Sequence, residues 1–185
     1  MNATEIIRII EKGSDQYFSG LVEEVRSNLG TSHYRRLSDD ELSRRITAVY
    51  QNLERWIASR DDAAVQSTGG DLGKRRFDEG IPLGQVVLAL VLEENYLRKY
   101  LSNQGVPPEG EWGQTITEFF QKMMYSTAHG YEVALAHSNR LAQRAAVPAK
   151  PAAVAPPKPV SRTEDAKAEG DVQISRGGQI GEFGG

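Results

Sequence analysis

Apolar residues recur every three or four positions through the first 146 residues, and Gly, Pro and capping residues divide them into segments. This period places the apolar side chains of each segment on one face of an α-helix. No two alternating segments in this region predict paired β-strands. We therefore expect one all-α domain over residues 1–146, followed by a Pro/Ala/Gly-rich tail over residues 147–185 that is too polar to fold.

The clearest helix start is the sequence Ser38-Asp39-Asp40-Glu41, which matches a capping box. An apolar stripe follows it: Leu42, Ile46, Val49, Tyr50, Leu53, Trp56 and Ile57. Upstream, the spacing predicts a helix over residues 4–28, with a break near Gly13 and a stop at Gly30. Its inward face is expected to include Leu29.

Three more helices are expected downstream. The first is short and runs from Asp71 to Gly80; the second begins near Pro82 and ends before Gly105, and its run VVLALVL favours a central position. The third covers residues 109–146 and would be about 55 Å long at ~1.5 Å per residue. A helix of that length exceeds the width of a small domain, so its distal part is expected to project or to pair with another chain.

Composition excludes several functional classes. The chain has no cysteine, which excludes disulfides, thiol catalysis and Cys-ligated metals, and its formal net charge is -3. A negative chain has no overall field for nucleic acid, and no apolar run reaches the ~18 residues of a membrane span. The N-terminal residues do not match a signal peptide. We expect a cytoplasmic protein that binds neither nucleic acid nor membrane.

Motifs of catalysis and cofactor binding are also missing from the sequence. It contains no Gly-rich phosphate loop and no nucleophile-elbow pattern. His129 and His137 are eight residues apart on the last predicted helix, too far along its axis to share one metal ion, and His33 falls in a predicted loop. We expect no enzyme activity and no cofactor. A single histidine could still ligate haem, so a haem- or small-ligand-binding sensor is an alternative.

Glu94 is the residue that fits its surroundings least. It interrupts an apolar stripe of the central helix, where a carboxylate needs a partner or a raised pKa. Arg75 and Arg76 are the nearest cationic candidates in the sequence. We predict either a structural role for Glu94, in an ion pair or at a solvated end of the helix, or a ligand-binding or switch site with the two arginines.

The tail offers a second candidate site. It begins with the stiff segment PAKPAAVAPPKPV, and beyond that segment apolar and polar residues alternate. Such a segment can add as a strand to the sheet edge of a partner. The candidate docking residues are Val172, Ile174, Ile180 and Phe183. A structural adaptor that recruits a partner through its tail is thus another alternative, beside a tail with no role.

Residues 71–101, DLGKRRFDEGIPLGQVVLALVLEENYLRKYL, together with RRITAVYQNLERWI upstream, carry a family resemblance. The matching features are the aromatic Trp56, a segment with Gly73 and two arginines, the sequence Glu79-Gly80-Ile81-Pro82-Leu83, and the apolar helix after it. In these features the chain resembles the N-terminal domain of RsbR-type co-antagonist proteins, the sensory part of stressosome components, over roughly residues 34–131.

The resemblance implies a globin-like fold that usually lacks haem, forms homodimers and passes a signal through its last long helix. It implies a protein partner such as a kinase, a phosphatase or another regulator, and it carries no catalytic residues. The Pro/Ala-rich segment stands where that family has its phosphorylatable output domain. We therefore expect a free-standing, non-enzymatic sensor or adaptor domain of bacterial stress-response signalling.

Overall fold

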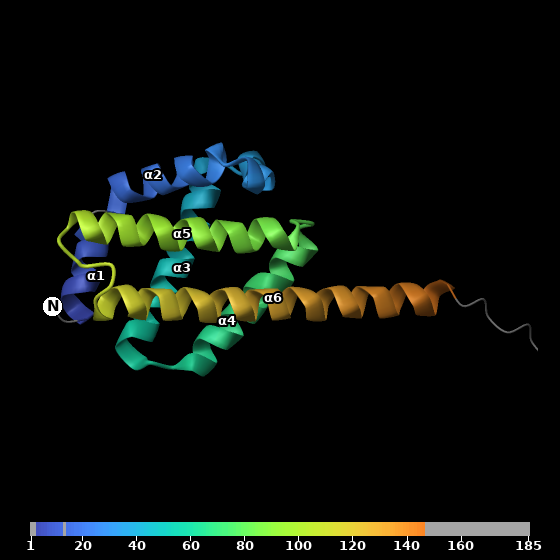
Figure 1. Ribbon diagram of the computed structural model, residues 1–185. Coiled ribbons are helices and arrows are strands. Elements are labelled where there is room, and N and C mark those ends of the chain that lie inside the picture. Colours follow the sequence, from blue (N-terminus) through green and yellow to red (C-terminus); the bar gives the residue numbers. More distant parts are fainter. Residues whose placement is uncertain (1–2, 13, 147–185) are drawn as a thin grey trace, which may run out of the picture. The chain divides into compact units, whose positions relative to one another are not determined.

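The computed structural model describes residues 3–12 and 14–146, and it confirms the predicted all-α fold with a long last helix. Within the described ranges there are seven helices and no strand. They are α1 (Ala3–Lys12), α2 (Ser14–Ser27), the 3₁₀ helix η1 (Leu29–Arg36), α3 (Asp39–Ser59), α4 (Asp62–Asp78), α5 (Leu83–Asn103) and α6 (Glu111–Ala146) (Figure 1). All belong to one compact unit, Met1–Pro148. The predicted tail and its four docking residues lie outside the described residues.

Helix α3 begins at the predicted cap and buries the predicted stripe. The Ser38 hydroxyl accepts a hydrogen bond from the Glu41 amide at 3.2 Å. The Glu41 side chain does not complete the capping box, because it pairs with Arg44 and Arg45 one turn further along the helix. All seven apolar residues of the stripe are buried.

The predicted stop at Gly30 is wrong. Helix α2 ends at Ser27, and Gly30 lies inside η1. The Asn28 side chain caps η1 by accepting a hydrogen bond from the Gly30 amide at 2.8 Å, so the chain enters a new helical turn. Leu29, expected to point inward, is 85% exposed.

The predicted start of α4 at Asp71 is also wrong, because the helix begins at Asp62. Asp61 caps it by accepting from the Ala64 amide at 3.1 Å. The sequence Gly69-Gly70, which suggests a break, lies inside the helix. Tertiary packing therefore overrides the low helix propensity of glycine at this point.

These glycines allow α4 and α6 to cross with their backbones almost in contact. A Cβ atom on Gly73 would lie 2.0 Å from the Thr127 carbonyl oxygen, and one on Gly130 would lie 2.1 Å from the Gly70 carbonyl oxygen. A Cβ atom on Gly69 would meet the Ser126 side chain at 2.6 Å. No larger residue fits these positions without a shift of one helix.

Helix α5 packs against α2, η1, α4 and α6, which agrees with the central position predicted for it. It runs beside α6 in Figure 1. It ends at a Gln104 cap, and Gly105 (φ 84°) turns the chain toward α6. Its buried apolar residues are Val86, Ala89, Leu90, Leu97 and Leu101.

Helix α6 has 36 residues and two dissimilar halves. The first half supplies core side chains, among them Phe119, Phe120 and Met123. In the second half Val133, Leu135 and Leu141 are exposed apolar residues. None of the helices in the described part of the chain combines the length and hydropathy that a bilayer-spanning segment requires.

The close crossing makes Gly73→Ala a destabilising change. We expect the free energy of unfolding to fall by about 1–3 kcal/mol, because α4 must move away from α6 to accommodate the methyl group. Gly70→Ala is the matched control on the same helix: nothing lies within 4 Å of the added Cβ atom, and alanine should stabilise the helix by up to about 1 kcal/mol. Urea unfolding measures both. Equal effects of the two variants would contradict the crossing.

Candidate functional site

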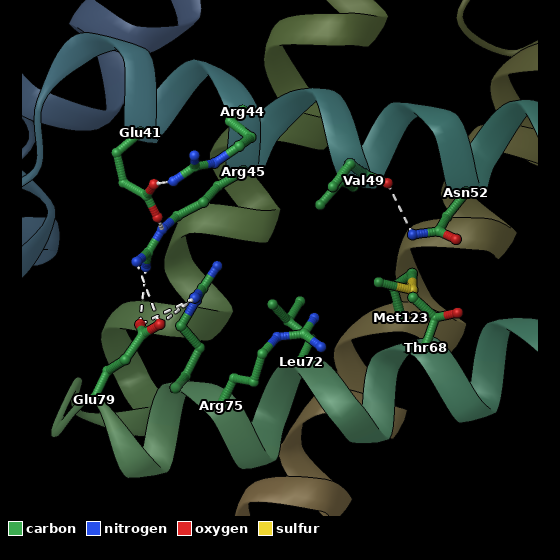
Figure 2. Close-up of a pocket in the computed structure, with 12 residues that line it drawn as sticks. Glu41, Arg44, Arg45, Val49, Asn52, Thr68, Leu72, Arg75, Glu79 and Met123 are labelled. Carbon is green, nitrogen blue, oxygen red and sulfur yellow. Dashed lines mark hydrogen bonds and ion pairs between the residues drawn. The ribbon is translucent and has the colours of Figure 1, made fainter.

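A cleft between α3 and α4 brings charged and apolar side chains together (Figure 2). Its volume is about 250 Å³. Glu41, Arg45 and Glu79 lie at one end of the cleft, and Asn52 and Thr68 lie at the other. The lining residues are Glu41, Arg44, Arg45, Ala48, Val49 and Asn52 of α3, Thr68, Leu72, Arg75 and Arg76 of α4, Glu79 at its end, and Met123 of α6.

Glu79 ties the two walls of the cleft together at the charged end. Its carboxylate accepts hydrogen bonds from Arg45 of α3 (2.9 and 3.3 Å) and from Arg76 of α4 (3.1 and 3.0 Å). Arg45 also pairs with Glu41 on its own helix. Arg76 is buried, so loss of Glu79 would leave its charge without a partner in the protein interior, which is strongly destabilising.

The charges of the cleft do not balance. Arg44, Arg45, Arg75 and Arg76 face only two carboxylates, those of Glu41 and Glu79, so two positive charges are in excess. Arg75 is exposed and makes no ion pair within the part of the chain that the structure describes. Figure 2 shows its side chain extending from α4 into the space between the two helices.

A buried acid lies behind the cleft. Glu93 of α5 lines a small cavity of about 20 Å³, four of whose lining residues, including Arg45 and Arg76, also line the cleft. The Glu93 Oε2 atom is buried and has no hydrogen-bond partner in the described ranges. Burial raises the pKa of Glu93 to about 8, and the charge of Arg76 only partly opposes this shift. At neutral pH Glu93 is therefore mainly a neutral acid.

Buried tyrosines surround Glu93. Tyr34 lines the same small cavity, and burial raises its pKa to about 12. The Tyr50 hydroxyl donates to the Glu93 carbonyl oxygen at 3.2 Å and is hydrogen bonded to the Tyr17 hydroxyl; burial raises the pKa values of both tyrosines. These three hydroxyls stay protonated at physiological pH, and those of Tyr17 and Tyr50 link α2, α3 and α5.

The structure does not bring Glu94 to Arg75 and Arg76, so the expected partnership is wrong. Glu94 accepts a hydrogen bond from Thr117 of α6 at 2.8 Å and lies 4.0 Å from Arg98. It is the preceding residue, Glu93, that shares a cavity with Arg76. Adjacent residues of a helix point about 100° apart, so the two carboxyl groups reach different neighbours.

The acid missed in the sequence had a visible signal. Glu93 and Glu94 stand side by side in an apolar helix, and both are buried. Leu90 and Leu97 flank Glu94 at four and three residues and Glu93 at three and four, so the spacing of these leucines does not distinguish the two acids. A broad buried face includes both positions, as it does on this central helix.

The histidines lie away from the cleft. His129 is exposed and stacks on Tyr125, and His137 lines a second groove, described below. The His33 amide donates to Gln85 of α5 at 2.9 Å. In the ranges 3–12 and 14–146, no group of three or more His, Asp or Glu residues is placed to hold a metal ion.

The second groove lies between the C-terminal parts of α4 and α6 and has a volume of about 660 Å³. Phe77 and Tyr131 contact each other edge to face at 5.4 Å where the two helices meet. The groove is lined by Gly70, Lys74, Phe77 and Asp78 of α4 and by Gly130, Val133, Ala134, His137, Ser138, Arg140 and Leu141 of α6.

The raised pKa of Glu93 predicts a pH-dependent stability. The unfolded chain loses this proton near the ordinary value of 4.5, whereas the folded chain keeps it until about pH 8. The free energy of unfolding therefore falls by on the order of 4 kcal/mol as the pH rises between these two values. Glu93→Gln removes the effect, so its advantage over the wild type should grow from pH 5 to pH 8 in urea unfolding. A constant difference across that range would refute the assignment.

Comparisons with known proteins add nothing to this geometry. No protein-family model matches the chain, and neither a curated protein nor a solved structure matches it significantly. The resemblance to RsbR-type domains therefore stays a prediction from the residues quoted for it.

Proposed function

We propose that this chain is a non-enzymatic signalling domain, a sensor or adaptor that forms homodimers through the projecting half of α6. The observation that carries the proposal is the unequal burial of that helix. An isolated helical segment is marginal in water, and most helices are stabilised by packing of an apolar face. The second half of α6 has exposed apolar residues, among them Val133 and Leu141, that a second helix would cover.

One face of α6 continues from the core of the domain into the second groove. We call this face the seam: residues 116, 120, 123, 127, 130, 134, 137, 141 and 144, which follow one another at alternating steps of four and three. Beyond the crossing with α4 its apolar side chains are those of Ala134 and Leu141. Ile116, Phe120, Met123 and Thr127 of this seam are buried within the domain. From Gly130 onward the same seam continues beyond the crossing with α4 and forms part of the second groove.

The partner of the seam is a second copy of α6. In a twofold dimer the same surface of each copy forms the interface, so the groove of one copy must accommodate α6 of the other. Ala134 is a small residue that admits a close helix, and Leu141 supplies an apolar side chain to bury.

Helix α4 couples the cleft to this dimer. One face of α4 lines the cleft with Leu72 and Arg76, and another packs on α6 through Gly69 and Gly73. Met123 of α6 also lines the cleft, so the two sites share one helix. A change in the cleft therefore reaches α6 through rigid contacts. Together with the resemblance to RsbR-type domains, this favours a bacterial signalling role.

Dimerisation is tested by measuring the mass of the full chain by sedimentation equilibrium at micromolar concentration. We expect twice the mass of one chain for the wild type. Leu141→Glu places a charge in the seam and should give monomers. Asn139→Glu adds the same charge at an exposed residue of α6 that does not line the groove, and should leave the dimer intact. A monomeric wild type, or a dimeric Leu141→Glu, would overturn the proposal.

A further inference from the structure

We infer that the cleft between α3 and α4 binds a small organic anion, with a carboxylate or phosphate head group at the arginines and a short apolar body against Val49, Leu72 and Met123. This inference names the chemical class of the ligand that the domain would sense. It rests on the proposed function only for the statement that the ligand acts as a signal. The binding itself requires nothing beyond the cleft.

The excess of guanidinium groups selects an anion. Arg45 and Arg76 already share the carboxylate of Glu79, and Arg44 pairs with Glu41. Arg75 lines the cleft without an ion pair in the described ranges. A guanidinium group donates two parallel hydrogen bonds to a carboxylate or a phosphate, so Arg75 is the group that such a head would engage.

The buried acid behind the cleft preserves this positive charge. Glu93 shares the small cavity with Arg76 and approaches it from the core side. Because it carries a proton at neutral pH, it does not cancel the charge of Arg76. Its Oε2 atom has no partner in the described residues, and Glu93 lines the neighbouring small cavity, not the cleft itself.

The wall and the volume define the rest of the ligand. Ala48 and Val49 of α3 face Leu72 of α4 and Met123 of α6, which together form an apolar surface. A volume of about 250 Å³ lies just below the ~300–1,000 Å³ of sites for drug-sized ligands. The cleft therefore suits a single ring or a short chain. Thr68 lines the cleft, and its hydroxyl can donate a hydrogen bond to the ligand or accept one from it.

Binding of the anion would act on α4, which lines the cleft, and through α4 on α6. An anion held by Arg75 would be bound between α4 and the arginines of α3, in contact with Met123 of α6. It would neutralise part of the excess charge that these walls present to each other. Binding would thus favour a shorter distance between α3 and α4, and α6 follows α4 at the glycine crossing.

The test is isothermal titration calorimetry of the full chain with benzoate, phenyl phosphate, inorganic phosphate and neutral benzamide. We expect benzoate or phenyl phosphate to bind at one site per chain, at least tenfold more tightly than benzamide. The better of the two identifies the head group. Inorganic phosphate should bind more weakly than phenyl phosphate, because it lacks the apolar body. No saturable binding of either organic anion below 10 mM would overturn the inference.

Variants locate the binding. Arg75→Gln should weaken binding at least tenfold, and Ala48→Trp, at an exposed position of the wall, should abolish it by filling the cleft. Arg36→Gln removes the same charge from an exposed residue of η1 outside the cleft and should change nothing beyond twofold. Circular dichroism checks that each variant is folded. Unchanged binding in Arg75→Gln, or an equal loss in Arg36→Gln, would place the anion elsewhere and refute the site.

The same titration in Leu141→Glu separates this inference from the proposed function. Binding that persists in a monomeric Leu141→Glu supports the site independently of the dimer. If the wild type binds the anion but is monomeric, the signalling proposal fails and the site stands. If the wild type is dimeric and binds none of the anions, the site fails and the dimer stands.

Discussion

The contact between the backbones of α4 and α6 determines how the rest of the domain is arranged. Gly70 and Gly73 on one helix meet the backbone of Gly130 and Thr127 on the other, and Gly69 meets Ser126. Close packing of this kind has little slack, and a shift must be taken up elsewhere in the core. With α4 fixed against α6, the remaining face of α4 meets α3 at a distance bridged by Arg45 and Glu79. The cleft is the space that this bridge leaves open.

The sequence predicts the fold where each signal is local. Ser38 caps a helix whose stripe from Leu42 to Ile57 is buried, and a capping side chain and a helical period depend only on neighbours in the chain. The start of α4 could not be predicted, because two adjacent glycines destabilise an isolated helix and their benefit comes from α6, more than 50 residues away. Contacts between distant segments decide such positions.

The candidate site was predicted in part. Arg75 and Arg76 lie in the cleft, but Glu94 faces α6 and Glu93 occupies the position that had been assigned to it. Periodicity describes the width of a buried face poorly, and it contains no information on which partner a buried acid meets. Arg45, which completes the charge network, lies on a different helix and 34 residues before its partner Glu79 in the sequence. Only the packing of α3 on α4 reveals it.

The length of α6 means that a small change in its direction moves its C-terminal end by a larger distance. Its crossing with α4 lies near Gly130, and sixteen residues follow to Ala146, a distance of about 24 Å at ~1.5 Å per residue. With the first half of α6 held in the core, a bend of about 5° at the crossing would displace the end of the helix by about 2 Å. A small change in the angle between α4 and α6 at the glycine crossing therefore produces a larger displacement at the C-terminal end of α6.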